Sequence, residues 1–223
     1  MPTSLATGAV AAAGVGIALR GARRELDDRT APMAGLVASF VFAAQMLNFP
    51  VGAGTSGHLL GGALAAVLVG PWTGVLCLSV VLLVQALLFA DGGVTALGTN
   101  ITLMGLVGVG VGWLVFRLAQ SVLPKRIGMV PVAAGVAALT TVPAAALTFV
   151  LLFAVGGQAP VSLGAVLTAM LGWHVLIGVG EAVITALVVS SVVAVRPDLV
   201  HGARRVLAAR TLEVRTPGSE VSA

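Results

Sequence analysis

Residues 58–90 read HLLGGALAAVLVGPWTGVLCLSVVLLVQALLFA, a stretch without Asp, Glu, Lys or Arg. Gly70-Pro71 divides it into a short apolar run and a longer one, 72–90. The longer run has the length of a transmembrane helix, because a helix needs about 20 mostly apolar residues to cross a bilayer. A Gly-Pro pair favours a turn between the two runs. The stretch therefore predicts two consecutive helical segments in a membrane.

The composition of the whole chain points the same way. The sequence is 58% hydrophobic and 9% charged, with a mean hydropathy of +1.10, which excludes an ordinary soluble domain. It contains 29 glycines, and small residues let helices approach one another closely in lipid. A membrane barrel would need alternating segments of about ten residues, whereas these runs are longer and uniformly apolar. We predict an all-α integral membrane protein, built as a compact Gly/Ala-rich bundle.

About seven apolar segments, some short or broken, follow one another along the chain: 4–20, 33–48, 58–70, 72–90, 97–118, 130–155 and 163–195. With the N-terminus outside and the C-terminus cytoplasmic, all 12 Lys and Arg residues fall on the inner side. This arrangement satisfies the positive-inside rule. We expect a multi-pass protein of a bacterial plasma membrane, whose basic inner surface faces anionic lipid headgroups or an acidic protein, not nucleic acid.

The domain organisation follows from the same pattern. Residues 1–200 are expected to form a single transmembrane domain. Residues 201–223 are expected to form a polar cytoplasmic tail, partly disordered because it is poor in apolar residues.

A small set of polar side chains interrupts the apolar segments, mostly at ends that lie on the outer side. The set comprises Gln45, Asn48, Ser56, His58, Asp91, Asn100, His174 and Glu181. Each of them alone could cap a helix or bond to a neighbouring helix. Ionisable groups are costly inside a membrane, however, and commonly mark a site. Their convergence on one side predicts a pocket, with Ser56 and His58 opening the third segment.

His58 is the candidate metal ligand, because neutral imidazole is the commonest side-chain ligand for transition metals. A site with histidine and few carboxylates suits cobalt, nickel, copper or zinc better than magnesium or calcium. His174 offers a second imidazole, while His201 belongs to the tail. Two imidazoles make an incomplete ligand set. Gln45, Ser56 and Asn100 are expected to orient His58 by hydrogen bonds, without themselves binding the metal ion.

Two other functions remain open from the residues alone. Gly54-Thr55-Ser56-Gly57 matches the G-x-S-G pattern of rhomboid-like intramembrane proteases, with Ser56 as nucleophile and His174 as base. This short pattern is frequent by chance in a Gly-rich chain. Uptake of an organic vitamin by a similar bundle is a further alternative, although aromatic residues for ring stacking amount to only 4%.

Four stretches extend the pattern around His58: FPVGAGTSGHL (49–59), GPW (70–72), QALLFADGGVTALGTN (85–100) and HVLIGVGEAVIT (174–185). Together they resemble the CbiM/NikM family, the substrate-binding membrane components of energy-coupling-factor transporters for cobalt and nickel. The resemblance implies capture of Co²⁺ or Ni²⁺ as transported substrate, without an organic cofactor. It also implies a transmembrane coupling subunit, two cytoplasmic ATPase subunits and often a small accessory membrane protein. The sequence has no Walker P-loop, so we do not expect this chain to be an enzyme.

The chain departs from this family at its start. Members begin with Met-His-hydrophobic-Pro-Asp/Glu-Gly, whose amino group, second backbone nitrogen and imidazole bind the metal with the histidine that matches His58. Here the chain begins Met1-Pro2-Thr3, and Pro2 has no amide hydrogen to lose. We interpret this as a start assigned too late, and we expect the chain as written to bind metal weakly or not at all. Cobalt and nickel both accept nitrogen ligands, so the sequence does not choose between them.

Overall fold

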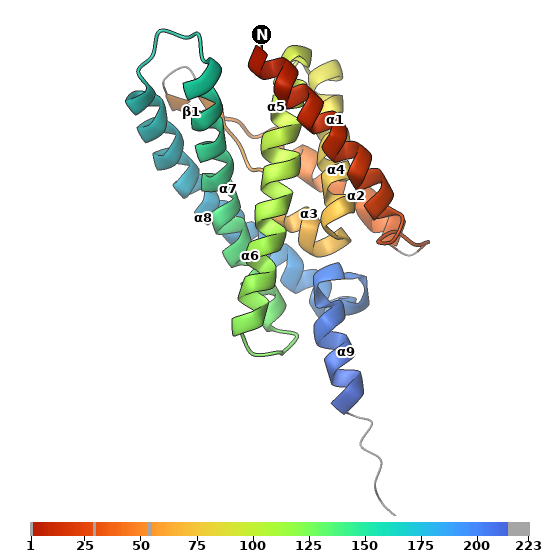
Figure 1. Ribbon diagram of the computed structural model, residues 1–223. Coiled ribbons are helices and arrows are strands. Elements are labelled where there is room, and N and C mark those ends of the chain that lie inside the picture. The colour runs from red at the N-terminus through yellow and green to blue at the C-terminus, as the bar shows by residue number, and fades with distance from the viewer. Residues whose placement is uncertain (1, 29, 53–54, 214–223) are drawn as a thin grey trace, which may run out of the picture.

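The computed structural model describes residues 2–28, 30–52 and 55–213, which form a bundle of helices (Figure 1). The α-helices are α1 (Pro2–Ala22), α2 (Thr30–Gln45), α3 (Gly62–Val69), α4 (Pro71–Leu88), α5 (Leu97–Asn100), α6 (Val109–Val122), α7 (Met129–Gly156), α8 (Leu163–Val195) and α9 (Arg204–Glu213). The shorter elements are the strands β1 (Phe49–Gly52) and β2 (Thr55–Gly57), the 3₁₀ turns η1 (Val94–Ala96), η3 (Pro197–Leu199) and η4 (His201–Ala203), and the π-helix η2 (Ile101–Gly108).

Five helical segments in the described chain are long and apolar enough to cross a membrane: Pro2–Ala22, Pro71–Leu88, Val94–Val122, Met129–Gly156 and Leu163–Val195. The helix α2 is shorter, with 16 residues, and α3 has only 8. Together these elements correspond to the expected segments, some of them short. The prediction of an all-α, multi-pass membrane bundle is confirmed.

Helix α3 lies in the middle of the bundle, and every one of its residues is buried (Figure 1). Glycines in α3 and in the neighbouring helical segment 94–122 let the two backbones come into close contact. A Cβ added to Gly112 would lie 2.8 Å from Cα of Ala63, and one added to Gly62 would lie 2.8 Å from the carbonyl carbon of Gly108. Such close approach is typical of small-residue packing between membrane helices. The short third segment is therefore a buried helix inside the bundle.

The expectation that Ser56 and His58 open a helix was wrong. Ser56 belongs to β2, which pairs antiparallel with β1, and His58 lies in the loop before α3. The helix begins only at Gly62 because Gly61 has a left-handed backbone, with φ of 75°. An added Cβ at Gly61 would also lie 2.7 Å from Cγ2 of Val41. Only glycine fits this bend without strain.

Other polar residues also lie away from the helix ends at which they were expected. Asn48 lies beyond the end of α2 at Gln45, and Asp91 lies beyond the end of α4 at Leu88. Asn100 lies inside the continuous helical segment 94–122, not at its start. In the expected polar tail, residues 201–213 are helical, while residues 214–223 lie outside the described part.

A buried acid sets the start of α4. Glu25, in the connection between α1 and α2, accepts hydrogen bonds from the backbone nitrogens of Trp72 at 3.3 Å and Thr73 at 2.7 Å. It also accepts one from the hydroxyl of Thr73 at 2.9 Å. The carboxyl group therefore caps free N–H groups of the first turn, where a negative charge also favours the helix dipole. Pro71 occupies that first turn, where its missing N–H costs nothing.

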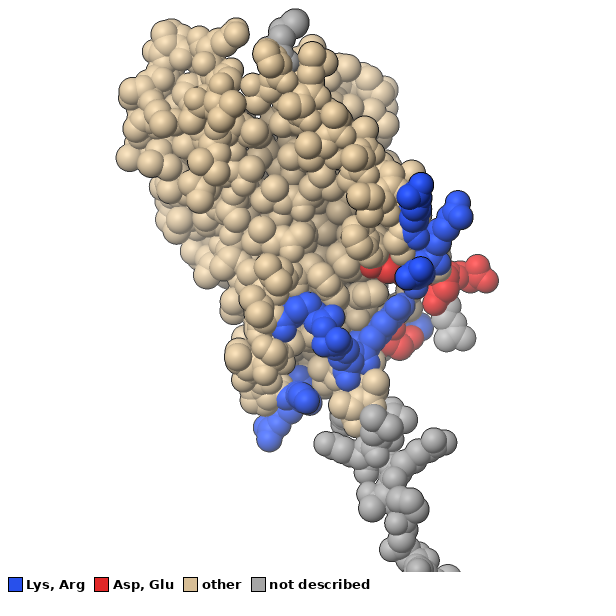
Figure 2. Space-filling view, in the orientation of Figure 1, with Lys and Arg blue, Asp and Glu red and all other residues tan. Residues whose placement is uncertain are grey.

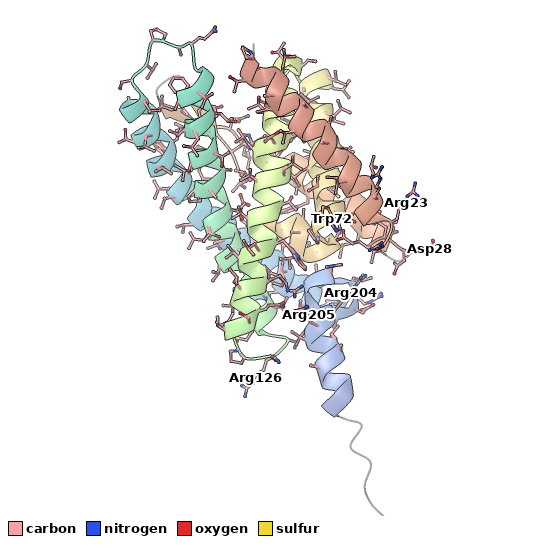
Figure 3. All side chains as sticks on the ribbon, in the orientation of Figure 1. Arg23, Asp28, Trp72, Arg126, Arg204 and Arg205 are labelled. Carbon is pink, nitrogen blue, oxygen red and sulfur yellow. The ribbon has the colours of Figure 1, made fainter. Side chains whose placement is uncertain are left out.

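Basic residues gather at one end of the molecule. On the face that Figure 2 shows, Lys and Arg side chains lie toward the end where α9 begins, and the end that carries the start of α1 shows none of them. Figure 3 places Arg126, Arg204 and Arg205 at this basic end and Arg23 where α1 finishes. This is the charge asymmetry expected of a membrane protein with a defined orientation.

Candidate metal-binding site

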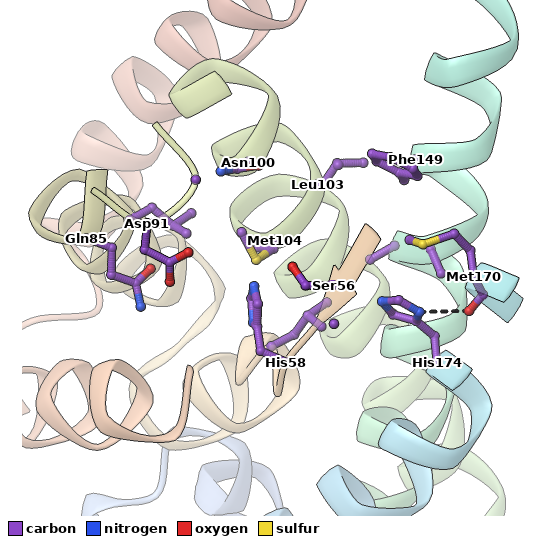
Figure 4. A pocket seen from close by; sticks show the side chains of 16 residues that line it. Ser56, His58, Gln85, Asp91, Asn100, Leu103, Met104, Phe149, Met170 and His174 are labelled. Atoms are coloured by element: carbon purple, nitrogen blue, oxygen red, sulfur yellow. Dashed lines mark hydrogen bonds between the residues drawn. The ribbon is translucent and has the colours of Figure 1, made fainter. Parts of the chain in front are cut away.

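A cavity of about 350 Å³ lies among β2, α4, the 94–122 segment, α7 and α8. Six polar side chains line it: Ser56, His58, Gln85, Asp91, Asn100 and His174 (Figure 4). Its apolar lining includes Leu103 and Met104, which lie on the π-helix η2. Wide π turns are rare and frequently occur at functional sites.

His58 is held in a defined orientation by its own loop. Its Nδ1 lies 2.8 Å from the carbonyl oxygen of Leu59. Because a carbonyl only accepts hydrogen bonds, Nδ1 of a neutral ring carries the proton and donates it. The other ring nitrogen, Nε2, then keeps its lone pair, which is the form that binds a metal ion.

His174 is held in the same way from the opposite wall. Its Nδ1 lies 2.7 Å from the carbonyl oxygen of Met170, one turn earlier on α8, and the side chain is only 6% exposed. The same reasoning leaves Nε2 of His174 unprotonated. A Cβ added to Gly57 would lie 3.3 Å from Cε1 of His174, so β2 packs directly against this ring. The cavity thus holds two imidazoles, each with Nδ1 occupied by a backbone carbonyl.

The wall opposite His174 contains Gln85, which sequence reasoning missed as a site residue. Figure 4 shows Gln85 and Asp91 on one side of His58, with His174 and Met170 on the other. Gln85 is 3% exposed, and its Nε2 is buried without a hydrogen-bond partner among the described residues. A buried unsatisfied amide is costly unless an occupant bonds to it. The sequence feature that could have identified Gln85 is a polar residue in the middle of an apolar run.

Two of the expected residues act outside the cavity. Glu181 accepts hydrogen bonds from the backbone nitrogens of Leu60 at 2.6 Å and Gly61 at 3.0 Å. Gln45 donates from Nε2 to the carbonyl oxygen of Leu60 at 2.7 Å. Both side chains are buried, and both hold the loop that follows His58. Asn48 is exposed and does not line the cavity.

Ser56 and His174, the pair expected of a rhomboid-like protease, both line the cavity. The described part of the chain shows no hydrogen bond between these two side chains, and Nδ1 of His174 bonds to Met170. Candidate metal ligands are also few. Within residues 2–28, 30–52 and 55–213, no three His, Cys, Asp or Glu side chains lie close enough to hold one ion.

These features define a polytopic helical membrane protein with an internal, imidazole-lined site. Residues 1–199 match the family described as cobalt uptake substrate-specific transmembrane region, and the chain belongs to this family. A putative metal transport protein of Haloquadratum walsbyi is 41% identical over 186 residues, covering 83% of each chain. A putative fused nickel transport protein NikMN of Archaeoglobus fulgidus is 42% identical over 167 residues, covering 75% of this chain and 55% of its own.

Solved structures are similar as well. The crystal structure of a transition metal transporter matches with a TM-score of 0.70 and 30% identity, covering 96% of each chain. A truncated transition metal transporter matches with a TM-score of 0.71 and 31% identity, covering 86% of this chain and 94% of its own. The family, the relatives and the fold agree that this chain is a cobalt or nickel transport component.

Proposed function

We propose that this chain captures Co²⁺ or Ni²⁺ at the outer face of the membrane, as the substrate-binding component of an energy-coupling-factor transporter. One observation carries the proposal: the ring of His58 lines the cavity, and the carbonyl of Leu59 occupies its Nδ1, which leaves Nε2 free to bind the ion. His174 is the second imidazole across the cavity. Imidazole nitrogen suits both metals.

The orientation rests on charge. The basic end lies on the cytoplasmic side under the positive-inside rule, which puts the opposite end, with the start of α1, outside (Figure 2). Within residues 1–223 there is no Walker P-loop, so ATP hydrolysis falls to two separate cytoplasmic ATPase subunits. A transmembrane coupling subunit links them to this chain, with a small accessory membrane protein as a further partner. The basic cytoplasmic end also meets anionic lipid headgroups.

The cavity leaves coordination positions for further ligands, because two imidazoles alone do not complete a cobalt or nickel site. A Met-His-x-Pro-Asp/Glu-Gly segment, as in the resembling family, would supply the missing nitrogens. Asp91 lies on the cavity wall, where a carboxylate would offset the charge of a dication in a medium of low dielectric constant. Ser56, Asn100 and Gln85 supply hydrogen-bonding groups around the bound ion.

The test is equilibrium binding of Co²⁺ and Ni²⁺ to the purified chain in detergent, with and without this extension. We expect tight binding only with the extension, and loss of binding on substitution H58A. The control is H201Q, which removes the third imidazole at the basic end and should leave the affinity unchanged. Equal affinity of the extended chain with and without H58A would refute the role of His58. Tight binding by the unextended chain would refute the need for the added nitrogens.

A further inference from the structure

The peptide group between Leu59 and Leu60 is hydrogen-bonded on both sides. Its carbonyl oxygen, on Leu59, lies 2.8 Å from Nδ1 of His58. Its N–H, on Leu60, donates to Oε2 of Glu181 at 2.6 Å. Because a peptide group is planar and stiff, fixing its N–H also fixes the direction of its carbonyl. A continuous chain of hydrogen bonds therefore runs from the Glu181 carboxyl group to the His58 ring.

The loop has little freedom to adopt another path. The second oxygen of Glu181 accepts from the backbone nitrogen of Gly61 at 3.0 Å. The carbonyl of Leu60 accepts from Nε2 of Gln45 at 2.7 Å, so α2 and α8 hold the loop from two directions. The Glu181 and Gln45 side chains are only 2% and 1% exposed, so water competes little for these bonds. Buried hydrogen bonds in sequence also polarise and strengthen one another.

We infer that Glu181 is a positioning residue, which acts through the Leu59–Leu60 peptide to fix the tautomer and direction of the His58 ring. The inference rests on the proposed function, in which His58 binds the metal ion. Metal-binding histidines commonly donate their second ring N–H to a carboxylate or a carbonyl, which fixes the tautomer and raises the basicity of the ligand nitrogen. Here a peptide group transmits the effect of the carboxyl group over one further hydrogen bond.

Glu181 and His174 both belong to α8. His174 lies on the same helix, α8, seven residues earlier, so one helix carries the second imidazole and also orients the first. A displacement of α8 relative to the loop would break the bonds to Leu60 and Gly61 while moving His174. The relative placement of the two imidazoles thus depends on the contact between Glu181 and the loop.

The test uses four variants of the full chain. E181A removes both acceptor oxygens. E181Q keeps one amide oxygen and should partly retain the tautomer of His58 and the Co²⁺ affinity. The control is T185V, a near-isosteric change at a buried polar position one turn further along α8. Nitrogen-15 spectra of the imidazoles in lipid nanodiscs, without metal, report the tautomer of His58, with H58N to assign its signals.

We expect a single Nδ1-protonated tautomer of His58 in the parent chain and T185V, and a mixture in E181A. With the extended chain, Co²⁺ affinity should fall about 10- to 100-fold in E181A, the range for partners that support a metal ligand. The Co²⁺ absorption spectrum should change as well. An unchanged tautomer and spectrum in both Glu181 variants would overturn the inference. A parent chain that binds no Co²⁺ even when extended would overturn the proposed function instead, while the tautomer measurement still decides on Glu181.

Discussion

Gly57 lies against His174 so closely that an added Cβ would sit 3.3 Å from Cε1 of the ring, 2.8 Å from Cγ2 of Val51 and 2.9 Å from Cδ1 of Ile177. The backbone of β2 therefore packs directly against the side chains of His174 and Ile177 on α8. Since His58 follows Gly57 directly, this contact sets the separation of the two imidazoles.

Substitution G57A tests this contact. The new methyl group would lie within 3.0 Å of Val51 on β1 and of Ile177 on α8, so these elements must shift apart, and the ring of His174 is held by its bond to Met170. Overpacking of this kind costs typically about 1–3 kcal/mol of stability. We expect weaker Co²⁺ binding by the extended chain, measured by titration in detergent. G172A is the matched control, since a Cβ at Gly172 on α8 meets nothing within 4 Å. Equal affinities of G57A and G172A would contradict the prediction.

Gln85 gives a prediction of opposite sign for stability and binding. Its buried Nε2 has no partner within the described chain, and an unsatisfied buried polar group costs about 1–3 kcal/mol. Q85L removes that group at similar volume. Without metal, we expect an equal or higher midpoint of thermal unfolding, followed in detergent with a chelator. With Co²⁺, we expect lower affinity, because an occupant of the cavity loses a hydrogen bond. A lower midpoint together with unchanged affinity would show that Gln85 is only structural.

The sequence predicted the membrane bundle because the lengths of apolar runs dictate spans. It also predicted that five polar side chains come together, and all five line the cavity: Ser56, His58, Asp91, Asn100 and His174. It did not predict the β1–β2 hairpin, because a Gly-rich run has no hydrophobic period to read. The late start of α3 depends on the backbone angle of Gly61 and its contact with Val41.

The role of Glu181 lay further beyond sequence reasoning. Its partner Leu60 is 121 residues away, and the bond goes to a backbone nitrogen, which leaves no pattern in residue types. Gln85 was hidden for a different reason. A polar residue within an apolar helix reads equally well as a contact between helices or as a cavity wall. Only the packing of α4 against the cavity separates these two readings.

The cap of α4 gives a prediction about stability alone. E25A removes three hydrogen bonds to the start of the helix, at Trp72 and Thr73. Loss of a cap costs about 0.5–2 kcal/mol, so the midpoint of thermal unfolding in detergent should fall by several degrees. E25Q keeps an acceptor oxygen and should fall less. Co²⁺ affinity of the folded extended chain should stay unchanged, because Glu25 does not line the cavity. A midpoint equal to that of the parent would argue against the cap.

His201 makes stability depend on pH at the basic end. Burial, together with the nearby positive charges of Arg204 and Arg117, lowers the pKa of its ring from 6.5 to about 4. The ring packs against Trp113 with centroids 5.4 Å apart. Since the unfolded chain takes up the proton near pH 6.5 and the folded chain only near pH 4, protonation favours unfolding between these values. The contribution is complete above pH 6.5 and is lost progressively as the pH falls toward 4.

Substitution H201F tests this dependence, because Phe keeps a ring against Trp113 but binds no proton. We expect the unfolding midpoint of the parent chain to drop more steeply than that of H201F between pH 7 and pH 4.5. The difference between the two curves isolates His201, since every other titrating group is shared. H58N serves as control, because it also removes one imidazole but at the cavity, and it should retain the steep drop. Parallel curves for the parent and H201F would show that His201 is protonated equally in the folded and unfolded chain.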